Sequence, residues 1–159
     1  MDTNCKEQIL FDVVAVDIVL ASECHFIIPP QETGLIEMAV ETGEIGEPVL
    51  TIATYSRDDE AEMENAPTLE QSEKIQLAGK IVSHSLSIPV AAGFERVREA
   101  ISNIGTQDVN IVLHTDDGED YLIYSLPCSS SVLLNEQNVN HLATVKIDAK
   151  SMNHVIRLI

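Results

Sequence analysis

The stretch IVLHTDDGEDYLIYSL, residues 111–126, places one histidine among several carboxylates. Imidazole and carboxylate groups together can hold a divalent metal ion or transfer a proton. Side chains two apart on a strand share a face, and a hairpin would return Glu119 to the face of His114 and Asp116. His114, Asp116 and Glu119 are therefore the candidate metal ligands, and His114 with Asp116 is the candidate acid–base pair. Because this spacing is common by chance, we favour a polar hairpin tip in which His114 packs beside Tyr121.

Two further residues are candidates for catalysis. Asp17 lies within the apolar run FDVVAVDIVL, where burial would raise its pKa and suit it to acid or base chemistry. A carboxylate in this position can equally face a partner or a strand edge, where its charge opposes aggregation. Cys128 follows a proline in a serine-rich loop, and no neighbouring base is present to generate a thiolate. The sequence contains no nucleotide-binding or hydrolase motif, and we expect no cofactor.

The overall charge limits the kinds of partner that this protein can bind. The chain has 159 residues and a formal net charge of -17, from 26 acidic and 9 basic residues. Nucleic acid and anionic membranes would be repelled, and only 4% of residues are aromatic, which leaves few faces for stacking on bases. We therefore expect protein partners, with no nucleic acid and no membrane.

The cysteines and the first residues indicate the compartment. Cys5, Cys24 and Cys128 are odd in number and never form a C-x-x-C pair, which argues against a disulfide framework and a structural zinc site. The first residues lack the basic and apolar regions of a signal peptide. We expect a cytoplasmic protein.

Alternating apolar residues predict several strands. Residues 11–20 are apolar on both faces except at Asp17, as expected for a strand that is covered on both sides. Asp117-Gly118 predicts a hairpin that joins residues 109–115 to residues 120–126. We expect Thr115 to lie opposite Asp120 in this hairpin, so that Asp120 points away from His114.

Two segments have the pattern of helices. The sequence TLEQ at 68–71 has capping-box spacing and predicts a helix over residues 68–85. Apolar residues at intervals of three and four predict a second helix over 91–104, ended by Gly105. The expected fold class is α+β, with a mainly antiparallel sheet and this pair of helices packed on one face. No repeat or linker divides the chain, so residues 1–159 are expected to form a single domain with an acidic loop at about 57–66.

The expected fold leads to three hypotheses about function. Two helices would cover only one face of the sheet, so the other face, with Val13, Val14, Val112 and Ile123, would be an interface. The first hypothesis is a non-enzymatic assembly, structural or regulatory subunit that forms a homo-oligomer or joins a larger assembly. The second is a small enzyme with a metal or acid–base site around His114 and Asp116. The third is an acidic mimic of nucleic acid that binds a basic protein.

Overall fold

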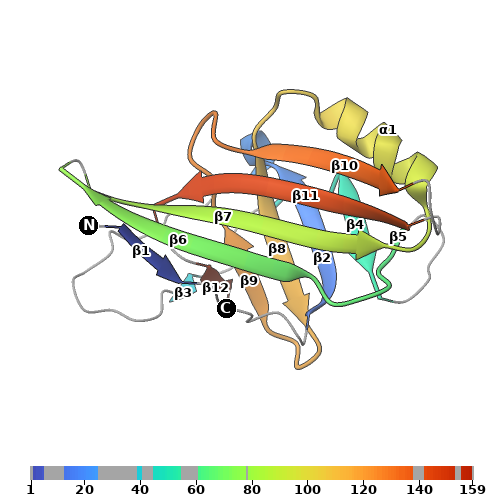
Figure 1. Cartoon of the computed structure of the whole chain (residues 1–159), viewed down its shortest axis with the longest axis horizontal. Coiled ribbons are helices and arrows are strands. Elements are labelled where there is room, and N and C mark those ends of the chain that lie inside the picture. The colour runs from blue at the N-terminus through green and yellow to red at the C-terminus, as the bar shows by residue number, and fades with distance from the viewer. Residues whose placement is uncertain are drawn as a thin grey trace.

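The computed structural model describes residues 2–5, 13–24, 39–40, 45–54, 61–77, 79–137, 142–152 and 155–158. Within these residues the chain forms two mostly antiparallel β-sheets and one α-helix. The two sheets lie one behind the other, with the helix at one end of the pair (Figure 1). A short 3-10 helix, Ala21–Glu23, follows the first strand of the larger sheet.

The sheet in front in Figure 1 has five strands, in the spatial order β1, β6, β7, β11, β10. Their bounds are Asp2–Cys5 for β1, Thr68–Gln76 for β6, Gly79–Val90 for β7, Leu142–Ser151 for β11 and Ser131–Gln137 for β10. We call it sheet A. All its neighbouring strands run antiparallel.

The sheet behind it, sheet B, has seven strands in the spatial order β3, β12, β9, β8, β2, β4, β5. Their bounds are Ala39–Val40 for β3, Ile156–Leu158 for β12, Asp120–Ile123 for β9, Val109–Thr115 for β8, Val13–Leu20 for β2, Leu50–Ala53 for β4 and Ala61–Glu62 for β5. At the two edges of the sheet, β3 pairs in parallel with β12, and β5 pairs in parallel with β4. All other neighbouring strands of sheet B are antiparallel.

The main core lies between the two sheets and is aliphatic. Val16 and Ile18 of β2 and Ile111 of β8 meet Leu86 and Ile88 of β7 in one continuous buried cluster. Along β7, buried and half-buried residues alternate, as a sheet packed on one face requires. In β8 the five residues Val109–Leu113 are all buried, which indicates that sheet B is covered on both faces there.

The helix predicted over residues 68–85 is wrong, because this segment forms β6 and the first half of β7. Leu69 and Gln71 are buried while Glu70 between them is exposed, which is the two-residue period of a strand. The residues that match a capping box therefore also match the pattern of a strand. The pairing of β6 with β1 and β7 selects the strand over the helix. A second sheet, rather than a pair of helices, covers the face where the helices were expected.

The helix predicted over residues 91–104 is confirmed as α1, Phe94–Ile104. Its buried residues are Val97, Ala100 and Ile104, and Gly105 donates its backbone N–H to the Ile101 carbonyl at 3.2 Å. The helix contacts β10, β4 and β5, so it covers one end of the core between the sheets (Figure 1).

The predicted β8–β9 hairpin is confirmed, but its predicted register is wrong by one residue. Asp120 lies opposite His114 and Tyr121 lies opposite Leu113. The Thr115 N–H donates to the Glu119 carbonyl at 3.0 Å, so the loop has three residues, 116–118, rather than the two expected. Gly118, the last of them, has a positive φ of 86°. The shift brings Asp120 to the face of His114 and places Tyr121 on the opposite, core-facing side.

Replacing Gly118 with valine should therefore lower the free energy of unfolding by about 1 kcal/mol. A Cβ atom here would meet no atom within 4 Å, so the expected loss comes from backbone strain and not from a clash. Gly118→Asn is the matched control, because asparagine tolerates positive φ, and it should cost less than half as much. Urea unfolding of the three proteins measures both values, and equal losses for both variants would contradict a strained turn.

The strand predicted over residues 11–20 is confirmed as β2 for residues 13–20, while residues 11 and 12 lie outside the described chain. Both faces of β2 are covered within one chain. On the side away from sheet A, Val19 joins Cys24, Val112 and Leu122 in a second buried cluster, against which Ile45 packs.

The residues expected at an interface are mostly inside the chain. Val13 and Ile123 belong to the core between the sheets, Val112 belongs to the second cluster, and Val14 is half-buried. A second copy is not needed to remove Val13, Val112 or Ile123 from water. The predicted acidic loop at 57–66 falls partly outside the described residues; within them, Ala61–Glu62 forms β5, and Met63 pairs with Val90 and is buried.

Candidate functional site

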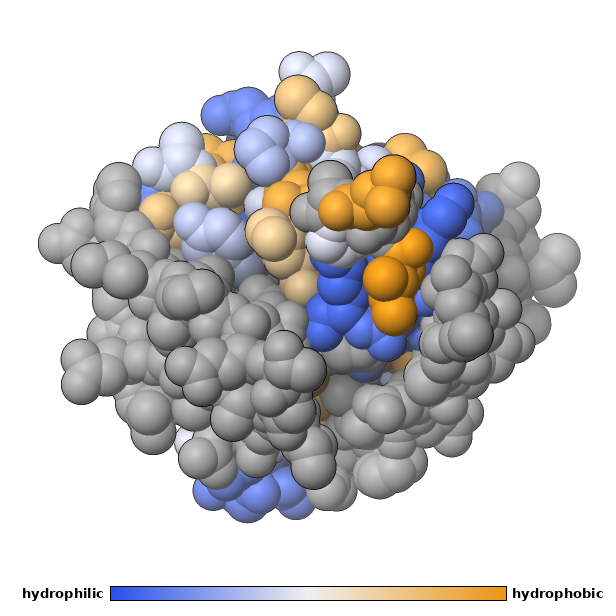
Figure 2. Space-filling model, turned by 90° about the vertical axis from the view of Figure 1, so that its left-hand side faces the viewer, coloured by the Kyte–Doolittle hydropathy of each residue, from blue (hydrophilic) through white to orange (hydrophobic). Residues whose placement is uncertain are grey.

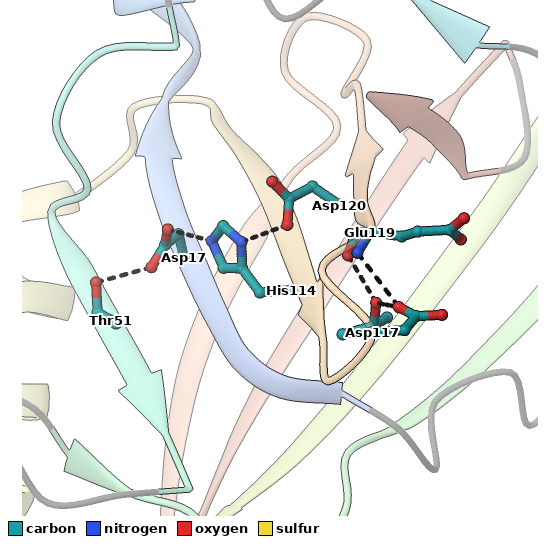
Figure 3. Close-up of polar contacts among 7 residues, drawn as sticks. Asp17, Thr51, His114, Asp117, Glu119 and Asp120 are labelled. Carbon is teal, nitrogen blue, oxygen red and sulfur yellow. Dashed lines mark hydrogen bonds and ion pairs between the residues drawn. The ribbon is translucent and has the colours of Figure 1, made fainter. Parts of the chain in front are cut away.

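His114 lies between two carboxylates that come from two different strands. Its Nε2 atom is 2.6 Å from Asp17 Oδ2, and its Nδ1 atom is 2.7 Å from Asp120 Oδ1 (Figure 3). Asp120 lies directly opposite His114 in the β8–β9 ladder. In the β2–β8 ladder Asp17 lies opposite Val112, which is two residues before His114 on β8. The side chains of Asp17 and His114 therefore lie on the same face of the sheet. The three strands thus bring Asp17, His114 and Asp120 together on the outer face of sheet B.

A fourth residue fixes the orientation of the more buried carboxylate. Thr51 of β4 lies opposite Asp17, and its hydroxyl donates a hydrogen bond of 2.8 Å to Asp17 Oδ1 (Figure 3). The side chains of Asp17, His114 and Asp120 are 18%, 32% and 41% exposed, so the group is open to solvent on the Asp120 side. Both Asp17 oxygens therefore have a defined partner, one hydroxyl and one imidazole.

The two carboxylates hold His114 in its charged form. The hydrogen bond to Asp17, supported by the bond to Asp120 and by both negative charges, raises the pKa of His114 to about 9, although partial burial opposes this shift. At pH 7 only about 1% of the ring is neutral. Both ring nitrogens then donate to carboxylates, which leaves no lone pair to bind a metal ion or accept a proton. The arrangement is that of a fixed ion pair.

The residues predicted to hold a metal do not converge. Asp116 is exposed in the β8–β9 turn and lines a separate cavity of about 400 Å³ with Val14 and Thr54. The Glu119 side chain points away from His114 (Figure 3). It accepts a hydrogen bond of 2.8 Å from the Tyr121 hydroxyl. Within the described ranges, no group of three or more histidine, cysteine, aspartate or glutamate side chains is arranged to hold a metal ion.

Cys24 and Cys128, the cysteines whose side chains the structure describes, are free thiols in unlike settings. Burial raises the pKa of the Cys24 thiol, whose Sγ donates to the Ile45 carbonyl at 3.3 Å. Cys128 is exposed, and its backbone N–H bonds both carboxylate oxygens of Asp108 at 3.0 Å. Asp108 therefore holds the backbone of Cys128 and not its thiol.

One buried polar pair was missed by the sequence analysis. His84 Nε2 of β7 and Ser151 Oγ of β11 are 2.6 Å apart, and both residues are buried. A serine bonded to a histidine is the geometry of an activated nucleophile, but the buried Ser151 hydroxyl offers a substrate no approach in this conformation. Assigning residues 79–90 to a strand would have placed His84 on the buried face with Leu86 and Ile88. The helix assignment concealed this signal.

Comparisons with known proteins identified no relative of this chain. No protein-family model, no curated protein and no solved structure matches this chain. Among the residues that the structure describes, no helix combines the length and the apolar character needed to cross a bilayer.

Proposed function

We propose that this chain is a non-enzymatic structural or regulatory subunit of the cytoplasm that acts through protein–protein contacts. The observation that carries this proposal is the projecting end of the β6–β7 hairpin, which we call the hairpin tip; it spans residues 74–80, of which the structure describes 74–77, 79 and 80. Cys24 and Cys128 form no disulfide, which supports the choice of the cytoplasm in this proposal.

The hairpin tip extends beyond the strands that flank it in sheet A. Along the described chain, β1 pairs with β6 only as far as Lys74, and β11 pairs with β7 only as far as Val82. Beyond these positions Ile75 pairs with Lys80 and Gln76 with Gly79, and within the described ranges no other strand pairs with the tip. Figure 1 shows it at the left, projecting past the ends of β1 and β11.

The hairpin tip exposes apolar side chains that a solvated turn would replace with polar ones. Ile75 is 59% exposed and Leu77 is 110% exposed, and they are two of the four large exposed hydrophobic residues in the described chain. Figure 2, which faces this end of the molecule, shows hydrophobic side chains at the surface beside polar ones. Single exposed apolar residues are common, but a pair on a projecting hairpin is typical of a contact surface.

The two other hypotheses draw less support from the described residues. A metal or acid–base enzyme around His114 and Asp116 would need these two side chains to act together, whereas both ring nitrogens of His114 are bonded to Asp17 and Asp120. A mimic of nucleic acid would need carboxylates in rows. The outward residues of β11 instead alternate in charge, with Asp148 between Lys146 and Lys150.

A photo-crosslinking residue at position 77 tests the proposal in cells that produce the protein. We expect one discrete crosslinked protein product from position 77, because the tip makes a specific contact. The control is the same crosslinker at position 106, an exposed turn residue that follows α1. The absence of any discrete product at position 77, or identical products at both positions, would count against a role in protein contact.

A further inference from the structure

We propose that the partner of the hairpin tip is a second copy of this chain, and that the tip of one copy docks on the acidic body of the next. This inference rests on the proposed function and names the partner of the same surface. It is carried by the charge of the tip, by the exposed side chains described above and by a cavity on sheet A.

The hairpin tip has the opposite charge to the rest of the molecule. Residues 74–80, KIQLAGK, contain two lysines and no acid, which is a charge of +2 in a chain of net charge -17. The remainder therefore carries -19, because -17 minus +2 is -19. Tips of two copies repel each other, whereas a tip and the body of another copy attract. Charge complementarity thus favours contact of tip with body.

A cavity at the base of the same hairpin has the features needed to receive the tip. It has a volume of about 410 Å³ and lies over β6, β7 and β11. The described residues that line it are Glu70, Gln71, Ser72, Ser83, His84, Ser85, Ser129, Asp148, Ala149 and Lys150. The small serine side chains leave room for an apolar side chain such as Leu77. Glu70 and Asp148 are the carboxylates that would meet Lys74 and Lys80. Lys80 would exchange its present ion pair with Glu73, at 3.4 Å in its own hairpin, for this contact. Lys150 also lines the cavity, and its positive charge reduces the attraction.

This contact would join two different surfaces and not the same surface twice. Each copy offers one tip and one cavity, so association can continue from copy to copy into a ring or a filament. Seven residues bury less than the roughly 800 Å² per partner of a standard interface, so we expect a dissociation constant in the micromolar range.

A charge exchange tests the contact in the purified full chain, with mass measured by light scattering up to several hundred micromolar. The tip variant carries Lys74→Glu and Lys80→Glu, and the cavity variant carries Glu70→Lys and Asp148→Lys. We expect the wild-type mass to rise with concentration above the 17.4 kDa monomer. Each variant alone should associate at least about tenfold more weakly, because like charges then face each other. An equimolar mixture should recover association, because each tip again meets a cavity of opposite charge.

The control variant changes the same charge outside the tip and the cavity, with Lys146→Glu and Arg98→Glu, and should associate like the wild type. All variants must show the unfolding transition of a folded protein before their masses are compared. A wild-type mass that stays at 17.4 kDa throughout, or variants whose mixture fails to recover association, would overturn the inference. Crosslinking from position 77 to a different protein, with no dimer of this chain, would also overturn it while leaving the proposed function in place.

Discussion

Replacing His114 with glutamine is expected to lower the free energy of unfolding by about 2 kcal/mol at pH 7, after allowance for solvent screening of these partly exposed groups. The substitution removes the positive charge that separates Asp17 from Asp120 and leaves two carboxylates facing each other. Glutamine can replace at most one of the two charged hydrogen bonds, which are 2.6 and 2.7 Å long in the native protein.

The loss should depend on pH in a defined direction. Folding raises the pKa of His114 from its ordinary value of 6.5 to about 9. The ion pairs therefore contribute their full stability below pH 6.5, and this contribution falls as the pH rises through 9. The difference in unfolding free energy between wild type and His114→Gln should accordingly be largest near pH 6 and should shrink toward pH 10.

Urea unfolding at several pH values measures this difference, and Asp116→Asn is the matched control. Asp116 is an exposed carboxylate in the adjoining turn that does not share the face of the ion pair, so its neutralisation should change stability by less than about 0.5 kcal/mol. A His114→Gln protein as stable as the wild type at pH 6 would show that His114 is not held as a cation.

Replacing Val112 with lysine is expected to cost roughly 4 kcal/mol or more and to unfold much of the protein. Val112 is 2% exposed and packs with Val19 and Leu122 on the outer face of sheet B. A lysine there would either bury an unpaired charge or force its covering residues away. Circular dichroism at 25 °C, together with urea unfolding, measures the effect.

Leu133→Lys is the control for this substitution, because Leu133 is 55% exposed on β10 and its replacement should be nearly neutral. The same experiment separates two views of the outer face of sheet B. If Val112→Lys stayed folded with wild-type stability while an oligomer dissociated, this face would be an interface between copies after all. Loss of the fold instead is what a face covered within one chain requires.

The sequence was sufficient where a local signal had only one structural solution. Asp117-Gly118 predicted the β8–β9 turn, and the apolar stripe that Gly105 ends predicted α1. It was insufficient for residues 68–85, where a capping-box pattern and a strand pattern coincide over the same letters. This segment forms strands because β6 pairs with β1 and β7 pairs with β11. These partners begin 66 and 74 residues away from Thr68, so no window of local sequence contains this information.

The candidate site shows the same limit at the level of single residues. Asp17 and His114 each stood out by type and position, but they are 97 residues apart in the sequence. Their pairing follows from the β2–β8 register, and the role of Asp120 follows from one extra residue in a loop. A slip of one residue reverses which side chains share a face, so a correct list of candidates still led to the wrong partners.

The pairing of β2 with β8 also sets an order of events during synthesis. The β6–β7 and β8–β9 hairpins join neighbouring segments and can form as soon as they leave the ribosome, whereas β2 must wait for a strand that pairs with it about 97 residues later. At 5–20 residues per second this wait lasts roughly 5 to 20 s. Throughout that time β2, which is covered on both sides in the finished fold, lacks its partner β8, so β2 is where the nascent chain is most prone to aggregate.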